Sequence, residues 1–395
     1  MKKKNIFKLL VALLFAFALM SVSCPGVQEE DDYICSDCNK ANCTCAIFSP
    51  YRGVNWDTWG QYKASLHVHS SNSDGSSSLS TVVEQHYTQN FDILAITDHS
   101  ETTNHLSKDY VNVNNGLTQT RFNEITAGAG RTSGKPMILI PDSSEQRMGT
   151  NTEEANAFFH PSSVFGGWVG DTYPVIMPRI QSDNGLAFVN HPGRATNGRN
   201  DAAQSSNPTW INLYANRFRT YPFLLGFEIM NRIDGDSRND RILWDNVLKV
   251  LVPEGRYIWG YSNDDSHSSS EIGVNYNMFL MPSNTLEDFR TAMVNGSFYG
   301  VARVAHNEGV NGTTGGTRPS ITGITVDQSA RTITINAANA DKIVWISEGK
   351  TVTTQTAFPA TLNLNTTYDE AIGSYVRANI IGNGIVFTQP FIIKQ

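Results

Sequence analysis

Residues 62–69 have the sequence YKASLHVH, and the prediction of the fold starts from them. This stretch is a β-rich run that ends in His67-Val68-His69. Residues i and i+2 of a strand point to the same face, so both imidazoles can bind one cation. Further β-rich runs follow, with helix-like stretches between several of them, and this alternation predicts an α/β fold with a largely parallel sheet, open or closed. The expected strands are residues 62–68, 91–97, 137–140, 186–190, 224–230, 257–261 and 277–281.

Helix signals are clearest in four stretches between or after these runs. Residues 80–89 follow a polar loop, and residues 173–184 stop before a glycine, which is common just after a helix. Residues 239–251 keep several apolar side chains near one face. Asn284 is expected to cap the last helix, with Glu287 as its capping-box partner.

Residues of metal-ligand type gather where the predicted strands end. In barrels built from βα units the reactive groups lie at the C-terminal ends of the strands, so these side chains are expected to meet at one mouth. One H-x-H pair alone would more often be a surface or packed pair, but the recurrence at successive strand ends favours a site. A mixed set of imidazoles and carboxylates suits zinc, manganese or iron. The residues concerned are 67–69, 73–75, 97–99, 141–145, 190–193, 228 and 264–267.

As a set, these motifs resemble the polymerase and histidinol phosphatase (PHP) superfamily over residues 60–305. The motifs are HVH at 67–69 with SDG at 73–75, TDH at 97–99, a later glutamate, NHP at 190–192 and DSH at 265–267. The resemblance implies a distorted (β/α)7 TIM-like barrel, two or three divalent metal ions (Zn, Mn or Fe) and hydrolysis of phosphoesters. It implies the following metal ligands: His67, His69, Asp74, His99, Glu145, His191, Asp265 and His267.

The resemblance also implies roles within this set. Glu145 is expected to bridge two ions, and Glu145, Asp265 and His191 are expected to be catalytic, with a metal-activated water as the nucleophile. The family usually has a histidine about ten residues after this glutamate. Here the first histidine is His160, fifteen residues on, and it is expected to be a further ligand, with a loop histidine as the alternative.

Other polar residues are expected to support the site. Arg194 and Arg303 are candidates for binding substrate phosphate, although either could be a surface arginine. Asp98 and Asn190 are expected to orient imidazoles, and Glu228 to close the mouth of the barrel. The remaining histidines, expected to be structural or solvated, are His86, His105 and His306.

Residues 1–24 have the pattern of a bacterial lipoprotein signal peptide. Three lysines precede an apolar run over residues 9–20, which is shorter than the ~20 residues that a membrane-spanning helix needs. Small residues before Cys24 resemble a lipobox, which implies lipidation of Cys24 and a membrane anchor. The expected location is the cell envelope, lipid-anchored at the outer membrane or cell surface and extracytoplasmic. The alternative is an ordinary secretory signal with a chance cysteine.

Residues 25–50 are predicted to be a cysteine-rich tether. An oxidising compartment favours two disulfides, although the spacing could also bind one zinc ion. The cysteines are Cys35, Cys38, Cys43 and Cys45. Because these residues precede the alternating region, they are not expected to form the active site.

Residues 51–312 are predicted to be the metal-dependent hydrolase, and residues 313–395 a small antiparallel β-sandwich without histidine. The chain has 30 Lys and Arg against 37 Asp and Glu, a net charge of −7, which argues against a nucleic-acid partner. A small phosphorylated molecule is the expected substrate, and a phosphoesterase the expected enzyme. The alternatives are a metal-dependent hydrolase of a non-phosphate bond and a surface binding protein with an idle barrel.

Overall fold

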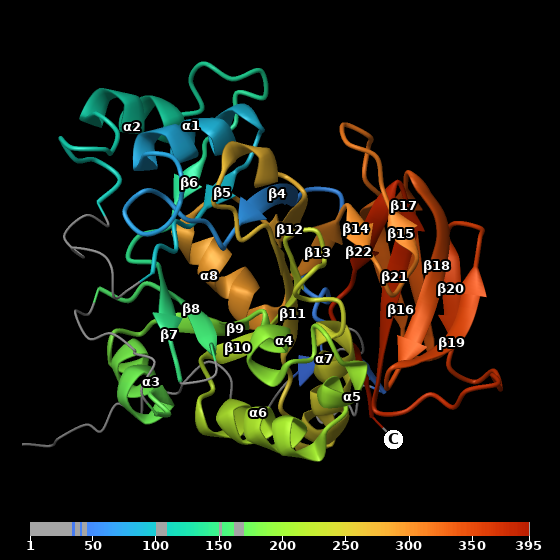
Figure 1. Ribbon diagram of the computed structural model, residues 1–395. Helices are drawn as coiled ribbons and strands as arrows, with labels where there is room; N and C mark the ends of the chain where they lie inside the picture. The colour runs from blue at the N-terminus through green and yellow to red at the C-terminus, as the bar shows by residue number, and fades with distance from the viewer. Residues whose placement is uncertain are drawn as a thin grey trace, which may run out of the picture.

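The computed structural model describes residues 34–35, 40–41, 46–99, 109–149, 152–161 and 170–394. The predicted signal peptide, Cys24, the side chains of the four clustered cysteines and His105 lie outside the described residues. Strands and helices alternate through a mixed α/β structure, as the sequence predicts (Figure 1). Within the described part, no helix is both long and apolar enough to cross a membrane.

Three short parallel strands begin the α/β region. They are β4 (Gly60–Ser65), β5 (Ile93–Leu94) and β6 (Ile138–Leu139), with helices α1 (Leu79–Thr88) and α2 (Gln119–Thr126) between them. Antiparallel strands β12 (Asn275–Met281) and β13 (Phe298–Ala302) continue this sheet beyond β4. The sequence predicted a largely parallel sheet, whereas this sheet has both parallel and antiparallel strand pairs.

A second sheet has five strands in the order β11-β10-β9-β8-β7. Its strands are β7 (Ser144–Arg147), β8 (Glu154–Phe158), β9 (Leu186–Asn190), β10 (Leu224–Asn231) and β11 (Trp259–Asn263). Strands β9, β10 and β11 are parallel, whereas β7, β8 and β9 pair antiparallel. Strands β7 and β8 were not predicted, because both are short, β7 (SEQR) is polar throughout and β8 (EANAF) has no β-branched residue.

Two isolated parallel bridges join the two sheets at their ends. One pairs Val68, just beyond β4, with Ser266, just beyond β11, and the other pairs His99, beyond β5, with Glu145 in β7. The C-terminal ends of strands from both sheets are therefore neighbours, and the predicted ligand residues lie at these bridges or next to them.

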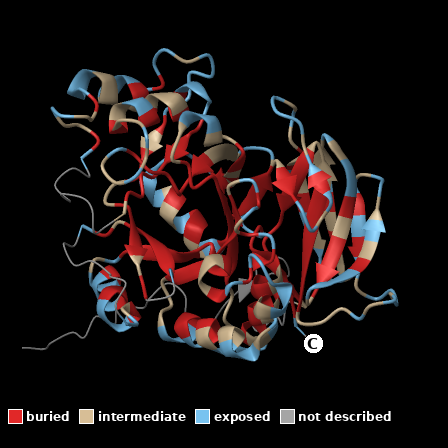
Figure 2. Cartoon of the chain, in the orientation of Figure 1, coloured by how far each residue is buried: buried red, intermediate tan, exposed pale blue. Residues whose placement is uncertain are grey.

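Helices cover the outer faces of these sheets, and their exposed sides alternate with buried ones (Figure 2). In α7 the buried side chains include Leu243, Val247 and Leu251, a spacing that places them on one helix face. The cap of α8 differs from the prediction: the Thr285 hydroxyl accepts the bond from the Asp288 amide, while the Asn284 side chain donates to two carbonyls elsewhere. The helices are α3 (Tyr173–Ser182), α4 (Pro192–Thr196), α5 (Ala202–Ser205), α6 (Pro208–Thr220), α7 (Asp240–Leu251) and α8 (Leu286–Asn295), with 3-10 turns η2 (Val252–Glu254) and η3 (Ser269–Glu271).

The C-terminal region is antiparallel, as predicted, but its strands fall into two groups. Strands β16 (Ser320–Asp327), β17 (Thr332–Ala338) and β20 (Ala360–Asn363) form a sheet of their own. The others extend the sheet of β13, because β22 pairs directly with that strand. They are β18 (Ala340–Ser347), β19 (Lys350–Gln355), β21 (Tyr375–Gly382), β22 (Gly384–Phe387) and β23 (Phe391–Ile393). The division at residues 312–313 stays a prediction.

Three short pairs complete the described strands: β1 (Ile34–Cys35) with β2 (Lys40–Ala41), β14 (Val304–Ala305) with β15 (Val310–Asn311), and β3 (Ile47–Phe48) with β23.

Polar side chains tie the last strands to the α/β region. The amide group of Gln389 donates to the carbonyl of Gly260 at 2.9 Å and accepts from its N–H at 2.8 Å, so it pairs with β11 as a strand would. The Arg377 guanidinium makes two bonds to Asp245 in α7, at 2.8 and 2.6 Å. These contacts are buried, so the C-terminal strands support the elements that carry the candidate site.

Candidate metal centre

Glu145, in β7, lies at the centre of a buried cluster of imidazoles. Its Oε1 atom is 3.2 Å from His67 Nε2 and 3.4 Å from His191 Nε2. Its Oε2 atom is 3.3 Å from His69 Nε2 and 3.2 Å from His99 Nδ1. Each carboxylate oxygen therefore faces its own pair of imidazoles, which is the arrangement expected of a carboxylate that bridges two cations.

Asp265 provides a second carboxylate on the side of His67 and His69. Its Oδ1 atom lies 3.3 Å from His67 Nε2 and 3.2 Å from His69 Nε2. Both Asp265 and His191 have a positive φ, of 49° and 20°, which is uncommon for residues other than glycine. Such backbone conformations are often found at functional sites, where the surrounding structure holds them in place.

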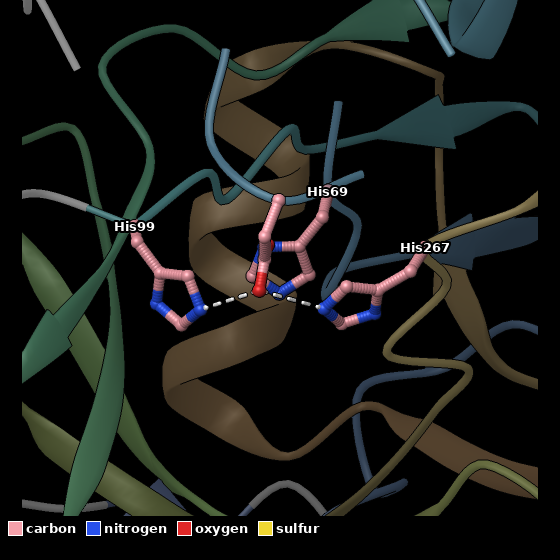
Figure 3. A group of neighbouring side chains, drawn as sticks. His69, His99 and His267 are labelled. Carbon is pink, nitrogen blue, oxygen red and sulfur yellow. Dashed lines mark ion pairs between the residues drawn. The ribbon is translucent and has the colours of Figure 1, made fainter. Parts of the chain in front are cut away.

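A third group gathers around Asp74, at the more open side of the cluster. Its carboxylate is 3.3 Å from His69 Nδ1, 3.3 Å from His99 Nε2 and 3.3 Å from His267 Nε2. Figure 3 shows the imidazoles of His99 and His267 on either side of one carboxylate oxygen, with His69 beside them; His69 contacts the other oxygen of Asp74. Because the Asp74 side chain is 52% exposed, this group is the part of the cluster that solvent reaches.

The spacing of these atoms fits bound metal ions. Ligands about 2.1 Å from an ion at tetrahedral or octahedral angles are about 3.0–3.4 Å from one another. The pairs between carboxylate oxygen and imidazole nitrogen given above all lie between 3.2 and 3.4 Å. Buried Nε2 atoms of His67 and His69 and Nδ1 of His191 have no hydrogen-bond partner among the described residues. Four overlapping groups could each hold an ion: His69, Asp74, His99 and His267; His67, His69 and Glu145; His67, His191 and Asp265; and His99, Glu145 and Glu154.

Charges within the cluster shift the pKa values of its members strongly. Burial lowers the pKa of His69, but the nearby carboxylates of Asp265 and Glu145 outweigh it and raise the pKa to about 10. Burial raises the pKa of Asp265, but the neighbouring imidazoles, His67 first, hold it below its ordinary value. Without cations His69 is thus protonated and forms ion pairs with these carboxylates. Metal ions would displace a proton of this ring, since imidazole binds a metal in its neutral form.

Glu228, in β10, holds one of the imidazoles in place. Its Oε1 atom is 3.0 Å from His67 Nδ1, and its Oε2 atom accepts a bond from the His191 N–H at 2.9 Å. Amide groups of Asn231 and Asn263 donate to the same carboxylate. A proton on His67 Nδ1 leaves Nε2 free to bind a metal ion, so Glu228 sets the tautomer of this imidazole. It was expected only to close the mouth of the barrel.

Asp98 and Asn190 contact other partners than the imidazoles predicted for them. The Asp98 carboxylate accepts bonds from Ser70 N and Oγ at 2.6 Å and from Ser73 Oγ at 2.7 Å, so it orders the loop that carries Asp74. The Asn190 amide donates to Glu145 Oε1 at 2.6 Å and therefore positions the central carboxylate.

His160 does not join the cluster. Its Nδ1 atom lies 2.6 Å from Asp183 Oδ2, at the end of α3, and it belongs to none of the four candidate groups in the described part of the chain. The acidic residue Glu154, nine residues after Glu145, faces the cluster instead, 3.8 Å from His99 Nδ1. The spacing after Glu145 could have identified Glu154, but the family pattern has a histidine at about this position.

Two arginines flank the cluster. Arg194, which was predicted, places its Nη1 atom 3.3 Å from His191 Nε2. Arg232, which was missed, lies 3.2 Å from Asp265 through Nε and 3.3 Å from His267 Nδ1 through Nη2. Arg303 contacts Thr314 at 3.1 Å and is not part of the described cluster. The other histidines are outside it too: His86 is buried in α1 against the Val82 carbonyl, and the His306 N–H donates to Asp234.

No protein-family model and no curated protein matches the sequence. Among solved structures, the chain is similar to a two-domain protein from Bacteroides vulgatus containing a predicted PHP-like metal-dependent phosphoesterase. The identity is 14%, the match covers 86% of this chain and 88% of that one, and the TM-score is 0.45.

Two further similarities are weaker. One is to a proposed metal-dependent phosphoesterase from Bifidobacterium adolescentis, with 14% identity over 52% of this chain and 88% of that one and a TM-score of 0.30. The other is to a lesion-specific endonuclease, EndoQ, from Pyrococcus furiosus, with 13% identity over 60% of this chain and 56% of that one and a TM-score of 0.37. One of these three proteins is thus described as PHP-like, and two are described as metal-dependent phosphoesterases. These likenesses assign no role to any residue.

Proposed function

We propose that this protein is a metal-dependent phosphoesterase of the PHP type with two or three divalent ions (Zn, Mn or Fe). The observation that carries the proposal is the position of Glu145, whose two oxygens face two separate pairs of imidazoles at 3.2–3.4 Å. Asp265 and Asp74 add carboxylates on two sides of it. This donor set is larger than one ion can use, which supports a trinuclear site.

The chain's own residues would set the geometry of the reaction. When bound, divalent ions supply a Lewis acid for a phosphoryl oxygen and an activated water nucleophile. Glu145 would set the spacing of two ions, Asp265 and His191 would complete the buried side, and Asp74 with His267 would hold a third ion at the open side. His160 has no part in this proposal, because it belongs to none of the candidate groups in the described part of the chain.

Arg194 and Arg232 are the proposed contacts to the substrate. Their side chains are 33% and 39% exposed, and each contacts the cluster, Arg194 at His191 and Arg232 at Asp265 and His267. The planar fork of a guanidinium matches two phosphate oxygens, so either arginine could bind the phosphoryl group. We therefore propose Arg232, and not the predicted Arg303, as the second arginine that contacts the substrate phosphate.

The finer features of the architecture and location belong to the same proposal. We propose that residues 60–305 form a distorted (β/α)7 barrel, which the two bridges between the sheets support. The lipobox-like sequence before Cys24 supports a lipid-anchored protein of the cell envelope, outside the cytoplasm, acting on a small phosphorylated molecule.

The test is a screen of phosphomonoesters, phosphodiesters and acyl esters with protein reconstituted with Mn²⁺, with and without chelator. The proposal expects chelator-sensitive release of phosphate or of a phosphomonoester. Hydrolysis of acyl esters alone would point to a hydrolase of non-phosphate bonds. A metal-loaded protein that hydrolyses none of the three classes would point to a binding protein with an idle site.

A further inference from the structure

Glu154 is a buried carboxylate that faces the metal cluster from β8. The side chain is 3% exposed, its Oε1 atom lies 3.8 Å from His99 Nδ1, and its Oε2 atom lies 3.7 Å from His191 Nε2. Both of these imidazoles also contact Glu145, at 3.2 and 3.4 Å. Two buried carboxylates therefore share the same two imidazoles.

Strand register brings Glu154 to this position. In the antiparallel pair of β8 and β9, Glu154 lies opposite Asn190, the residue before His191. In the pair of β7 and β8, Glu154 lies opposite Arg147, two residues after Glu145. The position is set by the backbone of a sheet rather than by a loop, so the carboxylate has little freedom to move away from the cluster.

A role as a simple partner of arginine does not account for this placement. The shortest distances from Glu154 to Arg194 Nη1 and Arg147 Nε are both 3.9 Å, longer than the ~2.7–2.9 Å of a charge-assisted hydrogen bond. Two neighbouring buried carboxylates repel each other unless a cation lies between them or one of them binds a proton. The atoms of His99, Glu145 and Glu154 all lie within 4.8 Å of one another, which leaves a place for one ion.

We infer that Glu154 is a direct ligand of one metal ion, which it binds together with His99 and Glu145. A carboxylate is a harder ligand than an imidazole. A site with Glu154 should therefore favour Mn²⁺ over Zn²⁺ more than a site with histidine at this position would. The inference rests on the metal centre proposed above, but it does not depend on which bond the enzyme hydrolyses.

The experiment is metal binding to the full chain, measured by elemental analysis and by calorimetric titration of the metal-free protein with Mn²⁺ and Zn²⁺. Glu154→Gln should lose about one equivalent of Mn²⁺ or bind it more than roughly tenfold more weakly, since an altered second-layer partner alone costs tenfold or more. Glu154→His should keep the number of ions and shift the preference towards Zn²⁺. Asp236→Asn is the matched control, because Asp236 also contacts Arg194, at 3.8 Å, and belongs to none of the described candidate groups.

Each outcome bears on Glu154 separately from the proposed activity. Unchanged Mn²⁺ stoichiometry and affinity in Glu154→Gln, or the same loss in Asp236→Asn, would overturn the inference. If Glu154→Gln does not fold, as judged by circular dichroism, the decision passes to Glu154→His, whose Mn²⁺ to Zn²⁺ preference must then differ from wild type. A wild-type protein that binds the ions but hydrolyses no phosphoester would remove the proposed function and leave the role of Glu154 intact.

Discussion

Replacing Glu228 with glutamine should weaken metal binding although Glu228 is not itself a proposed ligand. The carboxylate of Glu228 accepts from His67 Nδ1, His191 N and the amides of Asn231 and Asn263, at 2.9–3.0 Å. All four partners act as donors, so the NH₂ group of a glutamine must face at least one of them. The His67 ring then loses the partner that keeps its proton on Nδ1 and its Nε2 free for metal.

The expected size of the effect follows from these bonds. Hydrogen bonds to a buried charged group contribute about 1.5–3 kcal/mol each, and loss of a carboxylate behind a metal-binding histidine typically lowers metal affinity about 10- to 100-fold. Glu228→Gln should therefore bind its tightest Mn²⁺ at least tenfold more weakly and unfold at a lower temperature without metal. Competition with a chelator measures the first, and thermal unfolding followed by circular dichroism measures the second.

Glu153→Gln is the matched control for Glu228→Gln. Glu153 is also a buried carboxylate held by hydrogen bonds, but its partner is Arg217, and it belongs to none of the described candidate groups. The control should lose stability and keep its metal affinity. An Mn²⁺ affinity of Glu228→Gln within threefold of wild type would show that Glu228 does not support metal binding. An equal loss of Mn²⁺ affinity in Glu153→Gln would show that the effect is not specific to Glu228.

Three further predictions concern the substrate, acid stability and the C-terminal strands. Arg232→Ala should raise KM for a phosphoester about tenfold or more and keep the metal content. The control is Arg199→Ala, which should change neither, because Arg199 is 40% exposed and pairs with an aspartate outside the cluster. Equal KM values in the two variants would contradict this prediction. Burial lowers the pKa of His86 to about 4, so the folded state resists protonation of this ring. As pH falls from 7 to 4, wild type should lose up to about 3 kcal/mol more unfolding free energy than His86→Leu. If urea titrations give the same pH dependence of the unfolding free energy for both proteins, His86 does not contribute. Gln389→Ala should lower the unfolding free energy by about 1–3 kcal/mol, since it leaves the N–H and C=O of Gly260 buried without this partner; an unchanged urea midpoint would count against the contact.

The sequence predicted the site better than it predicted the sheet. His67 and His69 could be assigned together because the period of a strand places i and i+2 on one face, and the structure brings both to Glu145. Asp265 and His267 could be assigned by the same pattern. That these residues bind metal stays a prediction, but the structure places them within contact of one another, as expected.

The errors have definite physical causes. Glu154 was missed because the family pattern has an imidazole after the bridging glutamate, and His160 is the first histidine there. Arg232 was missed because a lone arginine after a strand is usually solvated. The pairing of β22 with β13, which makes the C-terminal strands continuous with the α/β region, depends on contacts across many residues that no local pattern encodes.

Glu145 is proposed to bridge two ions in a centre of more than one metal. The number of metal ions per chain, measured by elemental analysis after reconstitution and removal of excess metal, tests this bridge in wild type and in Glu145→Gln. We expect two or three ions per chain in wild type and the loss of at least one in the variant, because an amide is a poor bridge between cations. Fewer than one ion per chain in wild type, or the same number in both proteins, would contradict it.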